Sequence, residues 1–485
     1  MKITDFKDKK ITVMGIGLHG GGVGVIKFLS RAGAKILATD LRPAQELNKS
    51  LDALKNLSGV EYILGLHREE DFINADLIIK NPAVPDDSSF LKIAQDHKVP
   101  IETDVGIFFE LCHGIIIGVT GSRGKSTTAS LIHQFLKNKY PDTILAGNIR
   151  ASVLEKLNEI KKTTLVVLEL SSWQLNGLAK HEKSPQVAVI TNIIPDHLNR
   201  YKSMEDYIAD KKLIFKFQKP NNFLILNYDD ETLRSFPPEA KSRIYYYSAL
   251  NSQALTSPED LPQASQESRI GAYASSGKIF FGAAKEKIAE TSHIKLLGEH
   301  NLANILAATT VARLYDVPAK SIRKIIKEFP GLEGRLQLIQ EVRGVKYIND
   351  TTATIPEATI AAISTLTDHY SLNRDQLILI AGGADKNLNF EELAKLITDK
   401  TKAVFLLDGS ATHKLKREIK KQILSQNHPL IIKNFNNIEK AVISASKIAK
   451  RDDIVLLSPS CASFGLFRHE FERGEKFNQA VEKLN

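Results

Sequence analysis

Short apolar runs alternate with longer segments of helical period along most of the chain. Residues 11–15, 35–39 and 77–80 are apolar runs of strand length, and residues 24–32 between the first two have helical periodicity. Strand, helix and strand in this order indicate a parallel sheet with helices on both faces. We therefore predict an α/β fold for the first part of the chain.

The same alternation starts again at a predicted strand, 114–120, followed by a predicted helix, 125–138. Further strands of this second series are predicted at 164–170, 186–190 and 222–227. A third series of strands is predicted at 345–348, 376–381, 403–407 and 454–458. Residues 252–277 are rich in Ser, Gln, Ala and Pro, so we expect surface loops with weak strands there.

A hinge is predicted at residues 330–334, Pro-Gly-Leu-Glu-Gly, between an amphipathic helix at 322–329 and a strand-like segment at 336–341. A chain of 485 residues favours about three domains. We place the boundaries near residues 112 and 332. The expected domains are 1–112, 113–331 and 332–485, of which the first and third are Rossmann-like.

The composition fits an ordinary soluble globular protein, with 43% hydrophobic and 25% charged residues. The net charge of +9 is spread along the chain, so it is compatible with anionic small ligands and with weak nucleic-acid affinity. Cys112 and Cys461 cannot make a disulfide framework or a cysteine-based zinc site, which indicates a reducing compartment. The polar N-terminus and the lack of a run of about 18 apolar residues lead us to expect a cytoplasmic protein that does not span a membrane.

A glycine-rich turn, Gly15-x-Gly17-x-x-Gly20, follows the first predicted strand and precedes a helix. Small residues there let the backbone approach a diphosphate, which the helix amides would face. Asp40 ends the next strand and could bind a ribose hydroxyl, and Arg42 could neutralise phosphate. A tight turn without a ligand is the alternative.

A second glycine-rich loop is a near match to the Walker A motif, because residues 120–128 read T-G-S-R-G-K-S-T-T and Val119 stands where the first motif glycine is expected. Its backbone amides would form an anion nest, Lys125 would reach the terminal phosphates and Ser126 could bind Mg²⁺. The middle domain is therefore expected to be a P-loop mononucleotide-binding domain. Two phosphate loops in one chain suggest two nucleotides, one hydrolysed and one held.

Ligand-type side chains follow the strands beside this loop. Glu169 ends an apolar strand, where a second Mg²⁺ ligand belongs, although a solvated strand end is the alternative. His197 follows another apolar strand and is either a metal ligand or a structural histidine. Asn148 lies in a similar polar turn after a short apolar segment.

Six motifs, in the order TGSRGKSTT, LELSSWQL, NIIPDHLNRY, GEHNLAN, NDTTAT and SPSCASFGLF, resemble those of the Mur ligase family across essentially the whole chain. These enzymes form amide bonds with ATP in peptidoglycan precursor synthesis. The serine-rich C-terminal segment looks most like the branch that joins D-glutamate to UDP-N-acetylmuramoyl-L-alanine. Another Mur ligase or a folylpolyglutamate synthase-like enzyme stays open. The resemblance implies ATP and two Mg²⁺ as cofactors, small-molecule substrates without nucleic acid or membrane partners, and a monomer.

The resemblance also implies roles residue by residue. Those implied for ATP are Gly121, Ser122, Arg123, Gly124, Lys125, Ser126, Thr127, Asn301, Asn304, Arg335 and Asp350. Those for the UDP-sugar are Gly15, Gly17, His19, Gly20, Asp40, Arg42, Asn148, Ser171 and Gln174, and those for glutamate are Thr354, Lys386 and Ser463. The implied metal ligands are Ser126, Glu169, His197 and Lys211, and the implied catalytic residues are Lys125, His197 and Lys211. Domains 1–112, 113–331 and 332–485 would then bind UDP-sugar, ATP and glutamate respectively.

The family uses a lysine carbamylated by CO₂ in a Y-x-x-A-K-x-x-I pattern, which residues 207–214 match if Lys211 is modified. Asp210 stands at the usual small residue, and Lys212 is the alternative site. Carbamylation turns a cation into an anion that can bind Mg²⁺, and it requires a partly neutral amine.

Several positions depart from the family pattern. Thr352 replaces a common lysine, so one positive charge is missing or is supplied from elsewhere, conceivably by Arg123. Residues 81–83, Asn-Pro-Ala, replace the usual S-P-G and weaken the case for a uridine contact there. Phe471 comes later than the family spacing places its phenylalanine, so no contact is assigned to it.

The expected reaction runs through an acyl phosphate: the muramoyl-alanine carboxylate attacks the γ-phosphate of ATP, and the glutamate amine displaces phosphate. Closure about the 330–334 hinge would exclude water and bring in Arg335. A nicotinamide oxidoreductase would explain only the first glycine-rich turn. A non-catalytic nucleotide-gated binding protein is the other alternative.

Overall fold

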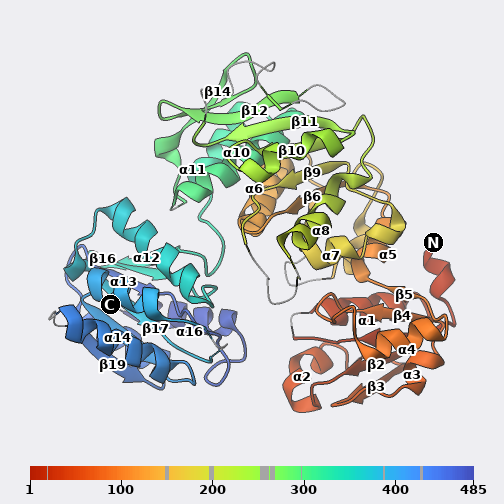
Figure 1. Ribbon diagram of the computed structural model, residues 1–485, viewed down its shortest axis with the longest axis horizontal. Coiled ribbons are helices and arrows are strands. Elements are labelled where there is room, and N and C mark those ends of the chain that lie inside the picture. Colours follow the sequence, from red (N-terminus) through yellow and green to blue (C-terminus); the bar gives the residue numbers. More distant parts are fainter. Residues whose placement is uncertain are drawn as a thin grey trace. The chain divides into compact units, whose positions relative to one another are not determined.

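The computed structural model, drawn in Figure 1, describes residues 1–18, 20–147, 152–195, 201, 203–251, 261–262, 268–296, 298–385, 388–426 and 430–484. The chain forms two compact units. One comprises Met1–His293 with Leu302–Ile326, and the other comprises Ile294–Asn301 with Lys327–Asn485. The strands of the described residues form three sheets.

The first sheet is fully parallel, with the strand order β3-β2-β1-β4-β5. Its strands are β1 (Lys10–Met14), β2 (Lys35–Asp40), β3 (Val60–Leu64), β4 (Leu77–Lys80) and β5 (Ile101–Glu102). Its helices are η1 (Ile3–Phe6), α1 (Gly21–Arg31), α2 (Ala44–Asp52), α3 (Glu70–Ile73), α4 (Ser89–Asp96) and α5 (Asp104–Leu111). Four consecutive residues of β1 are buried, as expected of a strand that is covered on both faces.

The second sheet has the order β14-β13-β12-β11-β10-β9-β6-β8-β7. Its strands are β6 (Ile115–Thr120), β7 (Ile144–Gly147), β8 (Leu165–Glu169), β9 (Val187–Ile190), β10 (Phe223–Asn227), β11 (Arg243–Ser248), β12 (Ser268–Ser275), β13 (Lys278–Phe281) and β14 (Glu286–Glu290). The helices of this region are α6 (Lys125–Lys139), η2 (Val153–Glu159), α7 (Ser172–Asn176), η3 (Ala179–His181), α8 (Met204–Lys216), α9 (Glu231–Arg234), η4 (Pro237–Glu239), η7 (Thr291–His293), α10 (Glu299–Leu314) and α11 (Ala319–Glu328).

Surface loops with weak strands were expected at 252–277, and the described residues there include a strand that is largely buried. Residues 268–275 form β12, an eight-residue strand whose Ile270 and Ala272 are buried. β12 runs parallel to β11 and antiparallel to β13, so this sheet is mixed. The polar composition hid the burial of this strand because its buried positions include Gly271, against which Thr310 and the Tyr246 backbone pack closely.

The third sheet has the order β15-β16-β20-β17-β18-β19. Its strands are β15 (Gln337–Val342), β16 (Val345–Asn349), β17 (Leu377–Ala381), β18 (Ala403–Leu407), β19 (Ile431–Phe435) and β20 (Ile454–Leu457). Its helices are α12 (Pro356–Tyr370), η8 (Arg374–Gln376), α13 (Glu391–Lys400), α14 (Thr412–Gln426), α15 (Ile438–Ile448) and α16 (Glu470–Glu482). β15 is antiparallel to β16, and the other pairs are parallel.

Each sheet therefore lies inside one of the three predicted domain ranges, and the domain boundaries near residues 112 and 332 stay a prediction. Among the described residues, no helix is both long and apolar enough to cross a bilayer.

Candidate active site

The P-loop connects β6 to α6 at the carboxyl edge of the second sheet, and two glycines give it its shape. Gly121 and Gly124 have φ angles of 143° and 83°, a region that residues with a side chain rarely adopt. A Cβ on Gly121 would lie 1.9 Å from Thr191 Oγ1, and one on Gly124 would lie 2.3 Å from Asn304 Oδ1. The loop backbone is therefore packed too closely for any side chain at these two positions.

The segment after β9 holds the P-loop from one side. The amides of Ser122 and Arg123 donate to the backbone and side-chain oxygens of Asn192, both at 2.9 Å. Ser122 Oγ lies 2.9 Å from Tyr207 Oη and also donates to Ile194 O. The hydroxyl of Ser122 thus fixes the loop to its neighbours. Sequence reasoning placed Ser122 at ATP and did not identify these contacts, for which the local sequence carries no signal.

Lys125 is the first residue of α6, and its side chain turns back over the loop. Its Nζ donates to Gly121 O at 2.9 Å and to Ser122 O at 2.8 Å. Ser126 is half-buried, Thr127 is buried and Arg123 is exposed. A lysine ammonium above a glycine-rich turn at a helix N-terminus is suited to a polyphosphate.

Glu169 and Lys211 lie at the same edge of the sheet. Glu169 ends β8, is only 3% exposed and pairs in register with Val119 of β6. Lys211 projects from α8 and is 2% exposed. Its Nζ donates to Gly121 O at 2.9 Å and to Thr120 Oγ1 at 3.3 Å, so two lysines bind the same loop carbonyl.

The neighbouring lysine points elsewhere. Lys212 forms an ion pair with Glu239 and lies 4.8 Å from the centroid of the Phe236 ring. Lys211 lies 4.9 Å from the centroid of the Tyr207 ring. Of the two candidates for carbamylation, Lys211 is therefore the one at the P-loop.

The residues present fit a magnesium–nucleotide site. A buried carboxylate on Glu169, a hydroxyl on Ser126 and a lysine that becomes an anion when carbamylated are oxygen ligands of the kind Mg²⁺ prefers. His197, the fourth implied ligand, lies outside the described residues. In the described ranges, no group of three or more His, Cys, Asp and Glu side chains forms a cation site, and the implied set contains only two such residues.

The two asparagines implied for ATP, Asn301 and Asn304, differ in position. Asn304 is buried, and its Oδ1 accepts a bond from Thr128 Oγ1 at 3.2 Å, beside Gly124. Its amide therefore lies at the P-loop. Asn301 is half-buried, and its backbone N–H donates to Gly298 O.

The first glycine-rich turn needs its glycines as well. Gly15, Gly17 and Gly20 have φ angles of 91°, 69° and 86°, and Gly20 precedes α1. Asn81 Nδ2 donates to Gly15 O at 3.3 Å, and a Cβ on Gly15 would lie 2.9 Å from Asn81 Cβ. Asn81, which the sequence marked only as a departure from S-P-G, thus contacts this turn. His19 and Asn148 lie outside the described residues.

Asp40 holds the turn in place. Its carboxylate is buried and accepts bonds from the amides of Gly17 and Arg42, both at 3.0 Å. Ser50 Oγ donates to Gly17 O at 2.7 Å from α2. The Arg42 guanidinium lies 3.5 Å from Asp40 and is about half exposed. Contact of Asp40 with a ribose hydroxyl stays a prediction.

Ser171 and Gln174 form a capping box at the start of α7. Ser171 Oγ accepts from the Gln174 amide at 3.3 Å, and Gln174 Oε1 accepts from the Ser171 amide at 3.0 Å. The S-x-x-Q spacing is the sequence signal for this arrangement. Both side chains therefore start a helix two residues after Glu169.

In the second compact unit, Asp350 is a buried acid that supports the predicted hinge. Its carboxylate accepts from the Leu336 amide at 3.1 Å and from Ser458 Oγ at 2.8 Å. Burial raises the pKa of Asp350 to about 7, although both hydrogen bonds and the nearby Arg335 charge lower it. Arg335 is exposed.

The segments implied for glutamate lie together. The Ser460 amide donates to Ala353 O at 2.9 Å, and Ala384 and Ala462 exchange backbone hydrogen bonds. Ser463 is buried and Thr354 is half-buried. Lys386, two residues after Ala384, lies outside the described residues. Three loops at one edge of the third sheet are thus bound to one another.

Thr352, which replaces the family lysine, has a structural role. Its Oγ1 and its amide both bind Gly334 O, at 2.9 and 3.1 Å. It therefore fastens the end of the predicted hinge to the loop after β16.

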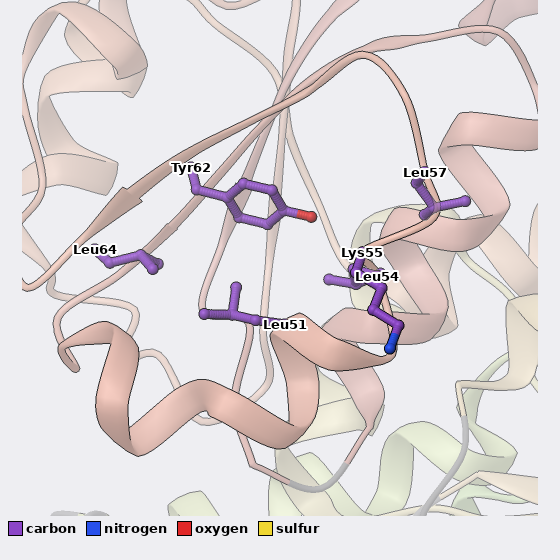
Figure 2. Close-up of a pocket in the computed structure, with 6 residues that line it drawn as sticks. All are labelled: Leu51, Leu54, Lys55, Leu57, Tyr62 and Leu64. Atoms are coloured by element: carbon purple, nitrogen blue, oxygen red, sulfur yellow. The ribbon is translucent and has the colours of Figure 1, made fainter.

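A cavity of about 290 Å³ lies between α2 and β3. Figure 2 shows its lining: Leu51, Leu54, Lys55, Leu57, Tyr62 and Leu64. None of the predicted site residues is among them. Burial raises the pKa of Tyr62.

A P-loop at the carboxyl ends of neighbouring parallel strands, flanked by two lysines and a buried carboxylate, is typical of a nucleotide-binding α/β protein. Three family models match it in chain order: the Mur ligase MurD-like N-terminal domain at 9–103, the Mur ligase middle domain at 119–312 and the Mur ligase glutamate ligase domain at 334–461. The chain belongs to the Mur ligase family.

Two relatives that are similar over their whole length share one name. UDP-N-acetylmuramoylalanine–D-glutamate ligase of Roseiflexus sp. (strain RS-1) is 43% identical over 98% of this chain and 99% of its own length. The protein with that name in Acetivibrio thermocellus is 35% identical over 100% of this chain and 99% of its own. The family resemblance seen in the sequence is thereby confirmed.

Solved structures confirm the α/β fold class. The crystal structure of UDP-N-acetylmuramate–alanine ligase from Thermotoga maritima has a TM-score of 0.60 at 17% identity and covers 98% of this chain and 100% of that one. A pseudomurein peptide ligase type C from Methanothermus fervidus has a TM-score of 0.53 at 18% identity, covering 99% and 100%. At these identities the likeness concerns the fold alone.

Proposed function

We propose that this protein is an ATP-dependent ligase that joins D-glutamate to UDP-N-acetylmuramoyl-L-alanine in peptidoglycan precursor synthesis. The name shared by full-length relatives at 43% and 35% identity supports this substrate pair. The structural observation that supports it most is that Lys125 and Lys211 both donate to the carbonyl of Gly121. Glu169, at the same edge of the sheet, is buried. That arrangement serves a reaction between two anions.

In the first step, the muramoyl-alanine carboxylate attacks the γ-phosphate of ATP, forming an acyl phosphate and releasing ADP. Both reactants are negatively charged, so positive charge has to lie between them. Lys125 supplies it, because its ammonium already lies over the loop at which the phosphates would bind. The close packing around Gly121 and Gly124 leaves no side chain of these two residues between the loop backbone and a bound phosphate.

In the second step, the amine of glutamate attacks the acyl carbon and inorganic phosphate leaves. Two Mg²⁺ ions, when bound, would neutralise phosphate charge. Ser126, Glu169, His197 and a carbamylated Lys211 are the ligands we assign to them. Lys211 is preferred to Lys212 because Lys212 is paired with Glu239.

We assign the UDP-sugar to domain 1–112, ATP to domain 113–331 and glutamate to domain 332–485. The glycine-rich turn held by Asp40, the P-loop, and the joined loops at Ala353, Ala384 and Ala462 support these three assignments in that order. We further propose that the protein acts in the cytoplasm as a monomer.

The test is an assay of phosphate release with a panel of UDP-muramoyl substrates and amino acids. We expect release that depends jointly on ATP, UDP-N-acetylmuramoyl-L-alanine and D-glutamate, with L-glutamate as the control. Release with a different pair would replace the substrate assignment but keep the ligase. Binding of ATP without release on any pair would instead support the nucleotide-gated binding protein.

A further inference from the structure

Arg473 is a fully buried cation in α16, with a side-chain exposure of 0%. Its guanidinium donates to Thr351 O at 2.8 Å, to Thr351 Oγ1 at 3.1 Å and to Cys461 O at 3.2 Å. All three partners are neutral. In the part of the chain that the structure describes, no carboxylate forms an ion pair with Arg473, and the ionisable groups whose charge would act on it are Cys461 and then Glu470.

The guanidinium joins the two loops implied for glutamate. Thr351 precedes Thr354 in the loop after β16, and Cys461 precedes Ser463 in the loop after β20. These loops also meet where the Ser460 amide donates to Ala353 O at 2.9 Å. The planar fork of an arginine can hold carbonyls of two segments at once.

A buried charge with neutral partners is costly unless an opposite charge comes near it. Burial lowers the pKa of Arg473 to about 10, so the group is still charged at neutral pH. Thr352 cannot supply the positive charge that its family counterpart carries, and its hydroxyl is bound to Gly334 O. The loops therefore lack the lysine charge that the family has at position 352, but they lie next to the charge of Arg473.

We propose that Arg473 is the positioning residue of the amino-acid site: it holds the 351–354 and 460–463 loops together, and its charge favours a dicarboxylic amino acid there in place of the lysine absent at position 352. It acts through these loops and does not itself touch the substrate. This inference rests on the proposed function, since it names a determinant of its amino-acid specificity.

The test compares R473Q, which removes the charge, with R473K, which keeps it. R468Q is the matched control, because Arg468 lies five residues earlier and its side chain is exposed and paired with Glu472. KM and kcat are measured separately for D-glutamate, ATP and the UDP-sugar, with Tm for each variant. We expect R473Q to raise the KM for D-glutamate about tenfold or more, because the positive charge behind the two loops and the charged hydrogen bonds that join them are lost. The other two KM values should stay within about threefold.

R473K and R468Q should keep the KM for D-glutamate within about threefold of wild type. Adding T352K to R473Q should return it toward wild type, because the charge is restored from the family position. A loss of kcat that follows Tm in every variant, with no selective change in the D-glutamate KM, would mean a purely structural clamp and would overturn the proposal. If R473Q does not fold, R473K decides: a rise of about tenfold in that KM overturns the role of charge.

The wild-type assay separates this inference from the function it rests on. If wild type releases no phosphate with D-glutamate, the proposed substrate is wrong. The variants are then compared with the amino acid that does support release. An unchanged KM for that amino acid in R473Q would overturn the inference independently.

Discussion

The carboxylate of Asp350 accepts a hydrogen bond from the backbone N–H of Leu336 at 3.1 Å, and Leu336 has a φ angle of 42°. A residue with a side chain in this left-handed region costs about 1–2 kcal/mol. The buried acid thus holds a strained residue directly after Arg335, at the end of the predicted hinge. Ser458 Oγ, 2.8 Å from the other carboxylate oxygen, keeps Asp350 in place.

Asp350 should make stability depend on pH. Burial raises its pKa from 3.8 to about 7 in the folded state, so between these values the folded chain keeps a proton that the unfolded chain loses. The free energy of unfolding should therefore fall as pH rises from about 4 to about 7, by at most about 1.4 kcal/mol per pH unit from this group. Below that window and above it, the contribution of Asp350 is flat.

Urea unfolding of wild type and D350N across this range isolates the group, because other carboxyls contribute equally to both. Wild type should lose stability relative to D350N as pH rises through the window. A constant difference between the two proteins would show that Asp350 ionises in the folded state as it does in the unfolded state.

Lys125 is expected to be essential for the transfer of phosphate. K125A should lower kcat about 10²-fold or more, because a positioned charge opposite the developing anion is lost. Phosphate release measures this, and K137A is the control, since Lys137 is exposed on the same helix. Near-wild-type turnover of K125A would contradict the assignment of this loop to ATP.

Carbamylation predicts chemical rescue at Lys211. K211A should lose most ligase activity and regain part of it with a small carboxylic acid such as acetate, which replaces the missing carboxylate. K212A should keep activity within about threefold, because Lys212 is paired with Glu239 outside the loop and a surface pair contributes little. Wild-type activity of K211A without added acid would exclude a carbamate at this position.

Gly124 should tolerate no side chain, for a reason beyond its backbone angle. In G124A the new Cβ would lie 2.3 Å from Asn304 Oδ1, in addition to left-handed strain of about 1–2 kcal/mol. G282A is the matched control, because Gly282 has a φ of 71° with nothing within 4 Å of its Cβ position. Unfolding should show a larger loss for G124A than for G282A, together with weaker ATP binding. Equal losses would mean that Asn304 moves aside freely.

Much of the fold was predictable from local pattern. The strands at 77–80 and 403–407 were predicted with the bounds that they have, and the other predicted strands differ by one residue at one or both ends. Strands such as β3, β5, β11 and β19 were not predicted. Buried parallel strands are short continuous apolar runs, and such runs are visible in one sequence. The burial of residues 268–275 was not foreseen within the weak strands expected at 252–277, because glycine and polar residues occupy part of that strand and its burial depends on distant Thr310 and Tyr246.

The sequence indicated which residues belong to the candidate site, but it did not indicate the hydrogen bonds that these residues make. The glycines at 121 and 124 and Lys125 were identified from spacing, because phosphate loops impose local geometry. The contact of Asp40 with a ribose stays a prediction, whereas the hydrogen bonds of its carboxylate with the amides of Gly17 and Arg42 were not foreseen. Long-range hydrogen bonds of this kind leave no mark in the local sequence.

The sequence by itself determined the α/β class, the two glycine-rich turns and the family, because hydrophobic period and motif spacing are local properties of the chain. Only the tertiary structure decided which lysine of the 211–212 pair faces the P-loop, and that Arg473 lies buried between two loops over 100 residues apart in the sequence. The reason is physical: burial and charge pairing are set by segments that meet only after the sheets have formed.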